Sequence, residues 1–216
     1  MPASRRRAII FLVAVAGVGG AFAASAAEAE RVVNIAMEDQ FKNRHETLRY
    51  RGDVVVLVYA ERKGAEAALE LGRRLHVRFH PTAAQAPATE WSRQPVVSPA
   101  GWPTSLAAPD VHVIPIACLP EVPKALETVA RSRFRKDSQF VSVWLDFEDT
   151  MRQQFGVVPH EPNVVVLDTR GCPQAVVSGH LDEVRFGEVV GVIDQLRLRT
   201  LQERTAAIPT AATMRR

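Results

Sequence analysis

The chain has 216 residues and a formal net charge of +3, from 27 basic and 24 acidic residues. Three of the basic residues lie in the first 27 positions, which hold no acidic residue, so the remainder carries 24 of each sign. Proteins that bind nucleic acid normally keep a basic face, and this balance argues against a nucleic-acid partner. The length favours one domain with additional segments.

Residues 1–27 have the three parts of a secretory signal peptide. Three arginines at positions 5–7 are followed by an apolar run at 8–18 and a small-residue cleavage site at 24–26. Residues 8–27 carry no charge and nearly reach the length of a bilayer span, so an uncleaved anchor is the alternative. We expect an exported protein, periplasmic or secreted, that contacts a membrane only if this segment stays uncleaved.

Residues 54–75 predict a buried strand followed by a helix. Residues 54–59 form a continuous apolar, mostly β-branched run, which suits a strand covered on both faces of a parallel sheet. The helix is expected to end near Leu75, and its apolar face holds Ala65, Ala68, Leu69, Gly72 and Leu75. The intervening turn, residues 60–66, lies at the carboxyl end of the strand, where open α/β sheets usually place their sites.

Residues 76–110 contain six prolines and two tryptophans, with little periodicity. A loop of this length inside a compact domain is uncommon. We interpret it as an insertion between core elements, fastened to the body of the domain by Trp91 and Trp102.

The core is expected to resume with a strand at residues 111–117, although Pro115 is unusual inside a sheet. A helix from about Glu121 follows. Its predicted apolar face consists of Val122, Ala125, Leu126, Val129 and Phe134, and its solvated side of Arg131, Arg133 and Arg135. Residues 140–145 predict a short strand, and residues 146–155 a short helix with Asp146 at its start.

The last third of the chain predicts a strand, a hairpin and a helix. An apolar strand runs up to Asp168, the turn 168–171 leads to a strand at 175–178, and a helix begins near Asp182. Its apolar positions follow helical spacing closely. The basic residues that follow, Arg197 among them, are interpreted as a solvated cluster, and residues 200–216 as a disordered tail.

The turn after the first core strand resembles the active-site turn of the thioredoxin superfamily, Ala-Glu-Trp-Cys-Gly-Pro-Cys-Lys. Ala60, Glu61 and Gly64 match, whereas Lys63 and Glu66 occupy the two cysteine positions. The peroxidase signature Pro-x-x-x-Thr-x-x-Cys and the copper-chaperone pair Cys-x-x-x-Cys are also missing. Residues 48–52 and 156–168 resemble the redoxin branch, and the likeness covers about residues 34–197 outside the insertion.

This resemblance implies an α/β, thioredoxin-like fold over residues 28–199, with a central mixed sheet flanked by helices and interrupted by the Pro-rich insertion 76–110. It also implies that Pro162 is the family's cis-proline and faces the motif turn across a groove. We expect this groove to consist of Arg62, Lys63, Glu66, His160, Glu161 and Pro162.

Lysine and glutamate cannot perform thiol–disulfide exchange, which needs a thiolate. We therefore expect no dithiol oxidoreductase activity and no cofactor, and favour non-catalytic binding of a protein or peptide at the groove. The alternative is that the groove with Lys63 and Glu66 is a solvated surface without a function. A carboxylate, a lysine and a histidine near one groove could also do acid–base work.

The alternative function is a redoxin-type protein that uses Cys118 as a single reactive thiol, since Cys118 follows the second core strand at the same sheet end as Lys63. Cys172 falls in the hairpin at the other end, so no Cys118–Cys172 disulfide is expected. His76 and His80 have the i, i+4 spacing of a shared metal site. They are weak metal candidates, because residues 77–79 favour strand or loop and Pro81 ends any helix.

Overall fold

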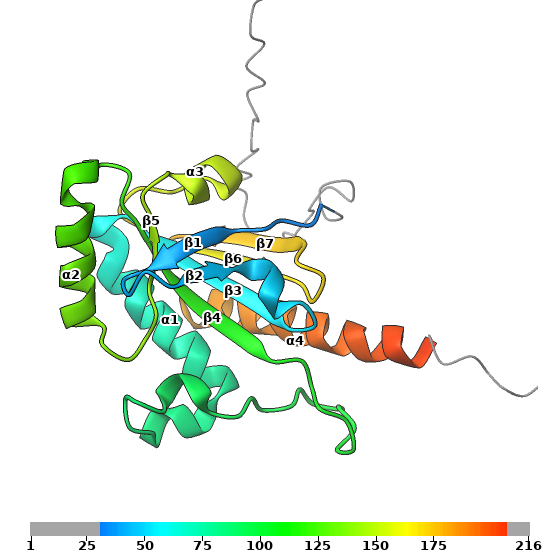
Figure 1. The fold of residues 1–216 in the computed structure, drawn as a ribbon. Coiled ribbons are helices and arrows are strands. Elements are labelled where there is room, and N and C mark those ends of the chain that lie inside the picture. Colours follow the sequence, from blue (N-terminus) through cyan, green and yellow to red (C-terminus); the bar gives the residue numbers. More distant parts are fainter. Residues whose placement is uncertain (1–30, 207–216) are drawn as a thin grey trace, which may run out of the picture.

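The computed structural model describes residues 31–206, which build a seven-stranded mixed sheet flanked by helices (Figure 1). The strands are β1 (Ala36–Asp39), β2 (Arg44–Glu46), β3 (Val54–Ala60), β4 (Val111–Cys118), β5 (Trp144–Asp146), β6 (Asn163–Leu167) and β7 (Pro173–Ser178). Their order in the sheet is β2-β1-β5-β4-β3-β6-β7. The helices are α1 (Ala65–Phe79), α2 (Glu127–Asp137), α3 (Thr150–Phe155) and α4 (Glu183–Ala206).

Strand β3 lies in the interior of the sheet, between β4 and β6, and all seven of its residues are buried. It pairs in parallel with β4 and antiparallel with β6. On one face, its alternate side chains pack with those of α1 and α4, for example Leu75 and Ile193. On the other face they pack with the start of the described chain and with α3, for example Ile35 and Met151. Burial on both faces explains why β3 is apolar without alternation.

The predicted α/β class and the thioredoxin-like element order are confirmed. The parallel unit β3–α1–β4 is followed by the antiparallel hairpin β6–β7 and by α4. Pro115 is tolerated in β4 because β5 pairs with β4 only from Ile116 onward. None of the helices in residues 31–206 is long and apolar enough to cross a bilayer.

Several element boundaries differ from the prediction; α2 and α3, for example, begin later than expected, at Glu127 and Thr150. Helix α1 continues past Leu75 to Phe79, because His76 and Phe79 also turn inward and are buried. Strand β5 is shorter and later than the predicted 140–145. Helix α4 runs to Ala206, so a disordered tail from residue 200 is wrong for residues 200–206; Thr200 is buried and its hydroxyl donates to Leu196 O. The predicted signal segment 1–27 and residues 207–216 lie outside the described residues.

The orientation of helix α2 differs from its prediction in part, although Arg133 and Arg135 are exposed as predicted. Arg131, predicted to be solvated, is buried; it donates to Asp39 O at 2.6 Å and pairs with Glu38 at 2.9 Å. Leu126 and Val129, predicted to be buried, are 52% and 63% exposed. The physical reason is the position of α2, which lies beside the end of β1 rather than over the sheet (Figure 1), where a guanidinium finds oxygen acceptors.

The segment between α1 and β4 is held in place by side chains of α1 and α4. Trp91 packs on His76 of α1, with ring centroids 3.9 Å apart, whereas the indole N–H of Trp102 bonds within the segment, to Leu106 O. The deepest anchor is Arg197 of α4. Its buried side chain donates to Pro109 O and Val97 O, both at 2.8 Å. Interpreting Arg197 as part of a solvated cluster was therefore wrong.

Candidate functional site

The motif turn opens α1 with three exposed charges. Residues Arg62–Gly64 form one 3₁₀ turn, closed by a hydrogen bond from Gly64 N–H to Glu61 O, and α1 begins directly after it. The side chains of Arg62, Lys63 and Glu66 are exposed. Since the turn follows β3, these charges stand at the carboxyl end of the central strand, as predicted from the sequence.

The loop before β6 packs directly on this turn. Gly64 is buried, and a Cβ atom placed on it would lie 2.7 Å from Glu161 O and 2.9 Å from Glu161 C. Both are backbone atoms, which cannot give way as a flexible side chain would, so only glycine fits. This contact brings His160, Glu161 and Pro162 to the turn of Lys63, which is the juxtaposition that the resemblance implied.

Pro162 is not preceded by a cis peptide bond; the described residues contain none, and this part of the prediction is wrong. The loop instead bends at His160, which has a left-handed φ of 68°. The Asn163 side chain closes it, donating to Glu161 O at 2.9 Å and accepting from Val158 N–H at 2.9 Å and from the Ser178 hydroxyl at 2.7 Å. These bonds hold the loop in its bent form.

The charged groups of this edge do not form an acid–base relay. Within residues 31–206, no hydrogen bond or ion pair joins Lys63, Glu66 and His160 to one another. General acid–base chemistry needs groups within hydrogen-bond reach of the proton they move. The edge is therefore a surface of separate, solvated charges on a firmly packed base.

Cys118 lies at the end of β4, paired in register with Asp146, and is only 5% exposed. Burial raises the pKa of its thiol to about 12, and the carboxylates of Asp146, Asp149 and Glu61 add to the increase. A reactive cysteine needs the opposite environment, a nearby cation or helix N-terminus that stabilises the thiolate. Cys172 is also buried, in the β6–β7 turn at the other end of the sheet, and neither cysteine is half of a disulfide.

An ion-pair cluster beside Cys118 was missed from the sequence. Arg152 of α3 bonds to Glu61, which follows β3, and donates to Asp149 at 3.1 Å. Hydrogen bonding to Asp149 raises the pKa of the Arg152 guanidinium. Asp146 accepts the N–H groups of Thr150 and Met151 at 2.9 and 2.8 Å, so its side chain caps α3, but from the end of β5, because the helix begins at Thr150 and not at the predicted Asp146. Glu61, a match to the family motif, thus fastens α3 to the end of β3.

His76 and His80 meet at the other end of α1, with rings stacked at 4.3 Å. His76 Nε2 lies 3.0 Å from Trp91 O, and the two ring nitrogens of His80 lie 2.9 Å from Gln94 O and 3.0 Å from Val111 O. These carbonyl oxygens occupy the directions that a metal would need. The described part of the chain contains no group of three or more residues suited to hold a metal ion.

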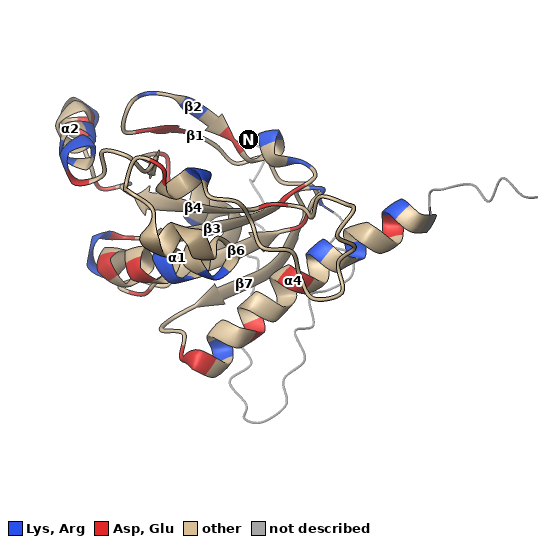
Figure 2. Cartoon of the chain, turned by 90° about the horizontal axis from the view of Figure 1, so that it is seen from below, with Lys and Arg blue, Asp and Glu red and all other residues tan. Residues whose placement is uncertain are grey.

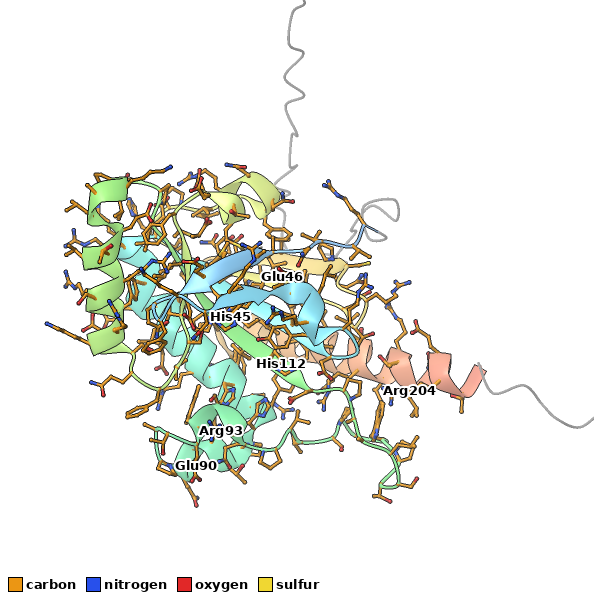
Figure 3. All side chains as sticks on the ribbon, in the orientation of Figure 1. His45, Glu46, Glu90, Arg93, His112 and Arg204 are labelled. Atoms are coloured by element: carbon orange, nitrogen blue, oxygen red, sulfur yellow. The ribbon has the colours of Figure 1, made fainter. Side chains whose placement is uncertain are left out.

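Two further histidines form pairs with aspartates that sequence reasoning did not single out. His45 of β2 contacts Asp39 at 2.9 Å, and His112 of β4 contacts Asp53 at 3.0 Å; both histidines are labelled in Figure 3. The hydrogen bond with His112 lowers the pKa of Asp53 despite partial burial. Burial opposes a similar decrease for Asp39, but its bonds with His45 and Asn43 outweigh that and lower the pKa. These pairs tie the ends of β1 and β3 to their neighbours.

Comparison with known proteins gives likeness of structure only. No protein-family model matches the chain, and no curated protein matches it. An exposed lipoprotein thioredoxin of Streptococcus pneumoniae is 12% identical with a TM-score of 0.48, over 76% of this chain and 99% of that one. A secreted thiol-disulfide isomerase of Corynebacterium glutamicum is 16% identical with a TM-score of 0.47, over 77% and 84%. A peroxiredoxin-like protein of Aquifex aeolicus is 14% identical with a TM-score of 0.44, over 78% of this chain and 86% of that one.

Proposed function

We propose that this chain is an exported thioredoxin-like domain that binds a protein or peptide, without thiol chemistry, at the edge formed by Arg62, Lys63, Glu66 and residues 160–162. The observation that carries this proposal is the motif turn itself. It keeps its place at the start of α1 and its contact with the loop before β6, yet it presents Lys63 and Glu66 where exchange chemistry needs thiols.

The burial of Cys118 opposes the alternative of a single-thiol redox protein. With a pKa of about 12, almost none of this thiol is ionised at neutral pH, and the thiolate is the nucleophile in such reactions. Its neighbours Asp146 and Asp149 are carboxylates, which disfavour a second negative charge. A thiol in this position is suited to packing rather than to catalysis.

The firmness of the edge favours binding. The backbone of Glu161 rests on Gly64, and Asn163 closes the loop with three short hydrogen bonds. A preorganised surface loses little conformational entropy when a partner docks. Because both signs of charge are exposed there, the partner is expected to present complementary charges of both signs.

Thiol accessibility tests the non-catalytic part. Ellman's reagent at pH 8 should react with neither cysteine in the folded chain and with both after unfolding in guanidinium chloride. Reduction of insulin disulfides should not exceed the rate with dithiothreitol alone. Rapid labelling of Cys118 in the folded chain would contradict the proposal.

A displayed library of extended peptides, selected on the folded chain, tests the binding part. Selected peptides should lose affinity for Lys63→Glu and keep it for Arg133→Glu, a matched charge reversal at an arginine of α2 whose side chain is 81% exposed. Peptides that bind all three proteins equally, or no enrichment at all, would show that the edge is a solvated remnant of the fold.

A further inference from the structure

A hollow of about 890 Å³ opens beside α1, away from the motif turn. Val113 and Pro115 of β4 contribute to its floor, Leu69 and Val77 of α1 to one wall, and Phe140 to the other. Five alanines and a glycine keep much of the remaining lining small. The volume falls in the range of small-molecule sites, which are mostly apolar.

The hollow exists because the crossover from β4 to β5 leaves this part of the sheet uncovered. The helix of a parallel crossover normally packs on the sheet. Here α2 is held beside β1 through Arg131, and β5 begins only at Trp144, so no strand pairs with the first half of β4 on that side. Neither Leu126, which directly precedes α2, nor Val129 of α2 lines the hollow.

Large apolar side chains stand open to solvent at the walls. Leu69 is 68% exposed and Phe140 is 53% exposed. Single exposed apolar residues are common, but two that face one apolar hollow are a marker of a binding surface. Covering them would add hydrophobic free energy in proportion to the area removed from water.

The chemistry of the walls favours an alkyl chain over a peptide. Two polar groups of the lining have internal partners: His76 Nε2 contacts Trp91 O, and the Ser138 hydroxyl donates to Val141 O. A peptide would bring amide groups that find few partners there, and burying an amide without a hydrogen bond is unfavourable. An alkyl chain requires no hydrogen bonds.

The charges at the rim favour an anionic head. Three arginines of α1 border the hollow, against one carboxylate, Asp137; basic positions of α1 are blue in Figure 2. Arg74 is paired with Glu183 at 2.7 Å and Arg73 with Glu70 at 3.3 Å. Arg78 is exposed and forms no ion pair with any residue in 31–206. A carboxylate is a favourable partner for such a guanidinium.

We propose that this hollow binds a long-chain carboxylate, with its alkyl chain against Leu69, Val77 and Phe140 and its carboxylate at Arg78. This site differs from the edge at Lys63, and the proposal does not depend on peptide binding at that edge.

Displacement of a fluorescent fatty acid, 11-(dansylamino)undecanoate, by dodecanoate below its micelle concentration tests the proposal on the folded chain. We expect saturable binding of one molecule. Leu69→Glu should weaken binding about tenfold or more, because it replaces apolar contact with charge. Val184→Glu, on an equally exposed valine of α4 (72%) outside the lining, is the matched control and should bind normally.

A neutral ligand separates the head group from the chain. The wild-type protein should prefer dodecanoate to 1-dodecanol, and Arg78→Gln should remove this preference, whereas Arg49→Gln, an exposed arginine outside the lining, should keep it. Unsaturable binding, or equal affinity for all variants, would overturn the proposal. So would a wild-type dimer that Leu69→Glu converts to a monomer, since the hollow would then be a self-interface.

Discussion

The two ends of α1 hold their charged and titratable groups in opposite ways. At the start of the helix, Lys63 and Glu66 point into solvent and bond to nothing within residues 31–206. At its end, His76 and His80 are buried, stacked and aligned with backbone carbonyls of the following segment. The start of α1 therefore offers charges for recognition at little cost to the fold, whereas stability and pH response are concentrated at its end.

The largest effect should come from removing Arg197, which fastens the segment after α1. Arg197→Met leaves the buried carbonyl of Pro109 and the part-buried carbonyl of Val97 without their donor, and an unsatisfied buried acceptor costs about 1–3 kcal/mol. We expect the free energy of unfolding to fall by about 4 kcal/mol, measured by guanidinium chloride denaturation. The control is Arg199→Met, at an exposed arginine two residues further along α4. An equal decrease in the free energy of unfolding in both variants would show that Arg197 does not anchor the segment.

Acid should weaken the end of α1 before it affects the start. Burial lowers the pKa of His80 from 6.5 to about 4, with His76 adding to the decrease and Asp110 opposing it. Between pH 6.5 and pH 4, His80 is therefore protonated in the unfolded chain but stays neutral in the folded chain. Its contribution to stability is complete above pH 6.5 and decreases as the pH falls toward 4. The loss should reach about 3 kcal/mol from His80.

This pH dependence is measured by chemical denaturation at pH 7, 6, 5 and 4.5. His80→Gln should flatten the curve, whereas replacing the exposed His180 by glutamine should not. Asp39 and Asp53 have lowered pKa values and lose their contribution only at more acidic pH, below the carboxyl value of 3.8. An unchanged slope in His80→Gln would place the acid sensitivity elsewhere.

At the start of α1, the backbone contact matters more than the charges. Gly64→Ala forces a methyl group into the backbone of Glu161, and overpacking of this kind costs about 1–3 kcal/mol. We expect a loss of about 2 kcal/mol, visible as a lower melting temperature. Gly187→Ala, in α4 with open space around its Cβ position, should be neutral or stabilising.

The smallest effect should come from the two charges themselves. Lys63→Ala and Glu66→Ala remove exposed side chains that form no ion pair within residues 31–206, and such changes stay within about 0.5 kcal/mol. A larger loss of stability in either variant would mean that the start of α1 is structural, and it would blur the contrast between the two ends of the helix.

The framework of this fold could be predicted because its elements bury continuous apolar patterns. The β3 run and the spacing in α1 and α4 identify strand and helices without knowledge of their neighbours. Lys63 and Glu66 could be placed at the sheet's edge because they follow β3 directly. The strand order explains why Cys118 and Cys172 lie far apart, as predicted.

The remainder depends on tertiary contacts that periodicity does not encode. Arg131 and Arg197 have the hydropathy of surface residues, but each is buried by donating to backbone carbonyls far away in the sequence. The exposure of Leu126 and Val129 follows from where α2 docks, and so does the hollow. The left-handed bend at His160 and the hydrogen bond from Asn163 to Glu161 O also leave no periodic pattern in the sequence.

The first described residues run along the turn between β6 and β7, where Val33 N–H donates to Gly171 O at 2.9 Å. This turn lies at the opposite pole of the sheet from the carboxyl end of β3. The described chain therefore begins at the pole opposite to Lys63. Attachment of the domain to a surface at residue 31 would hold the Lys63 edge outward, whereas immobilisation through Lys63 would hide it. Binding assays should accordingly tether the domain by its N-terminal end.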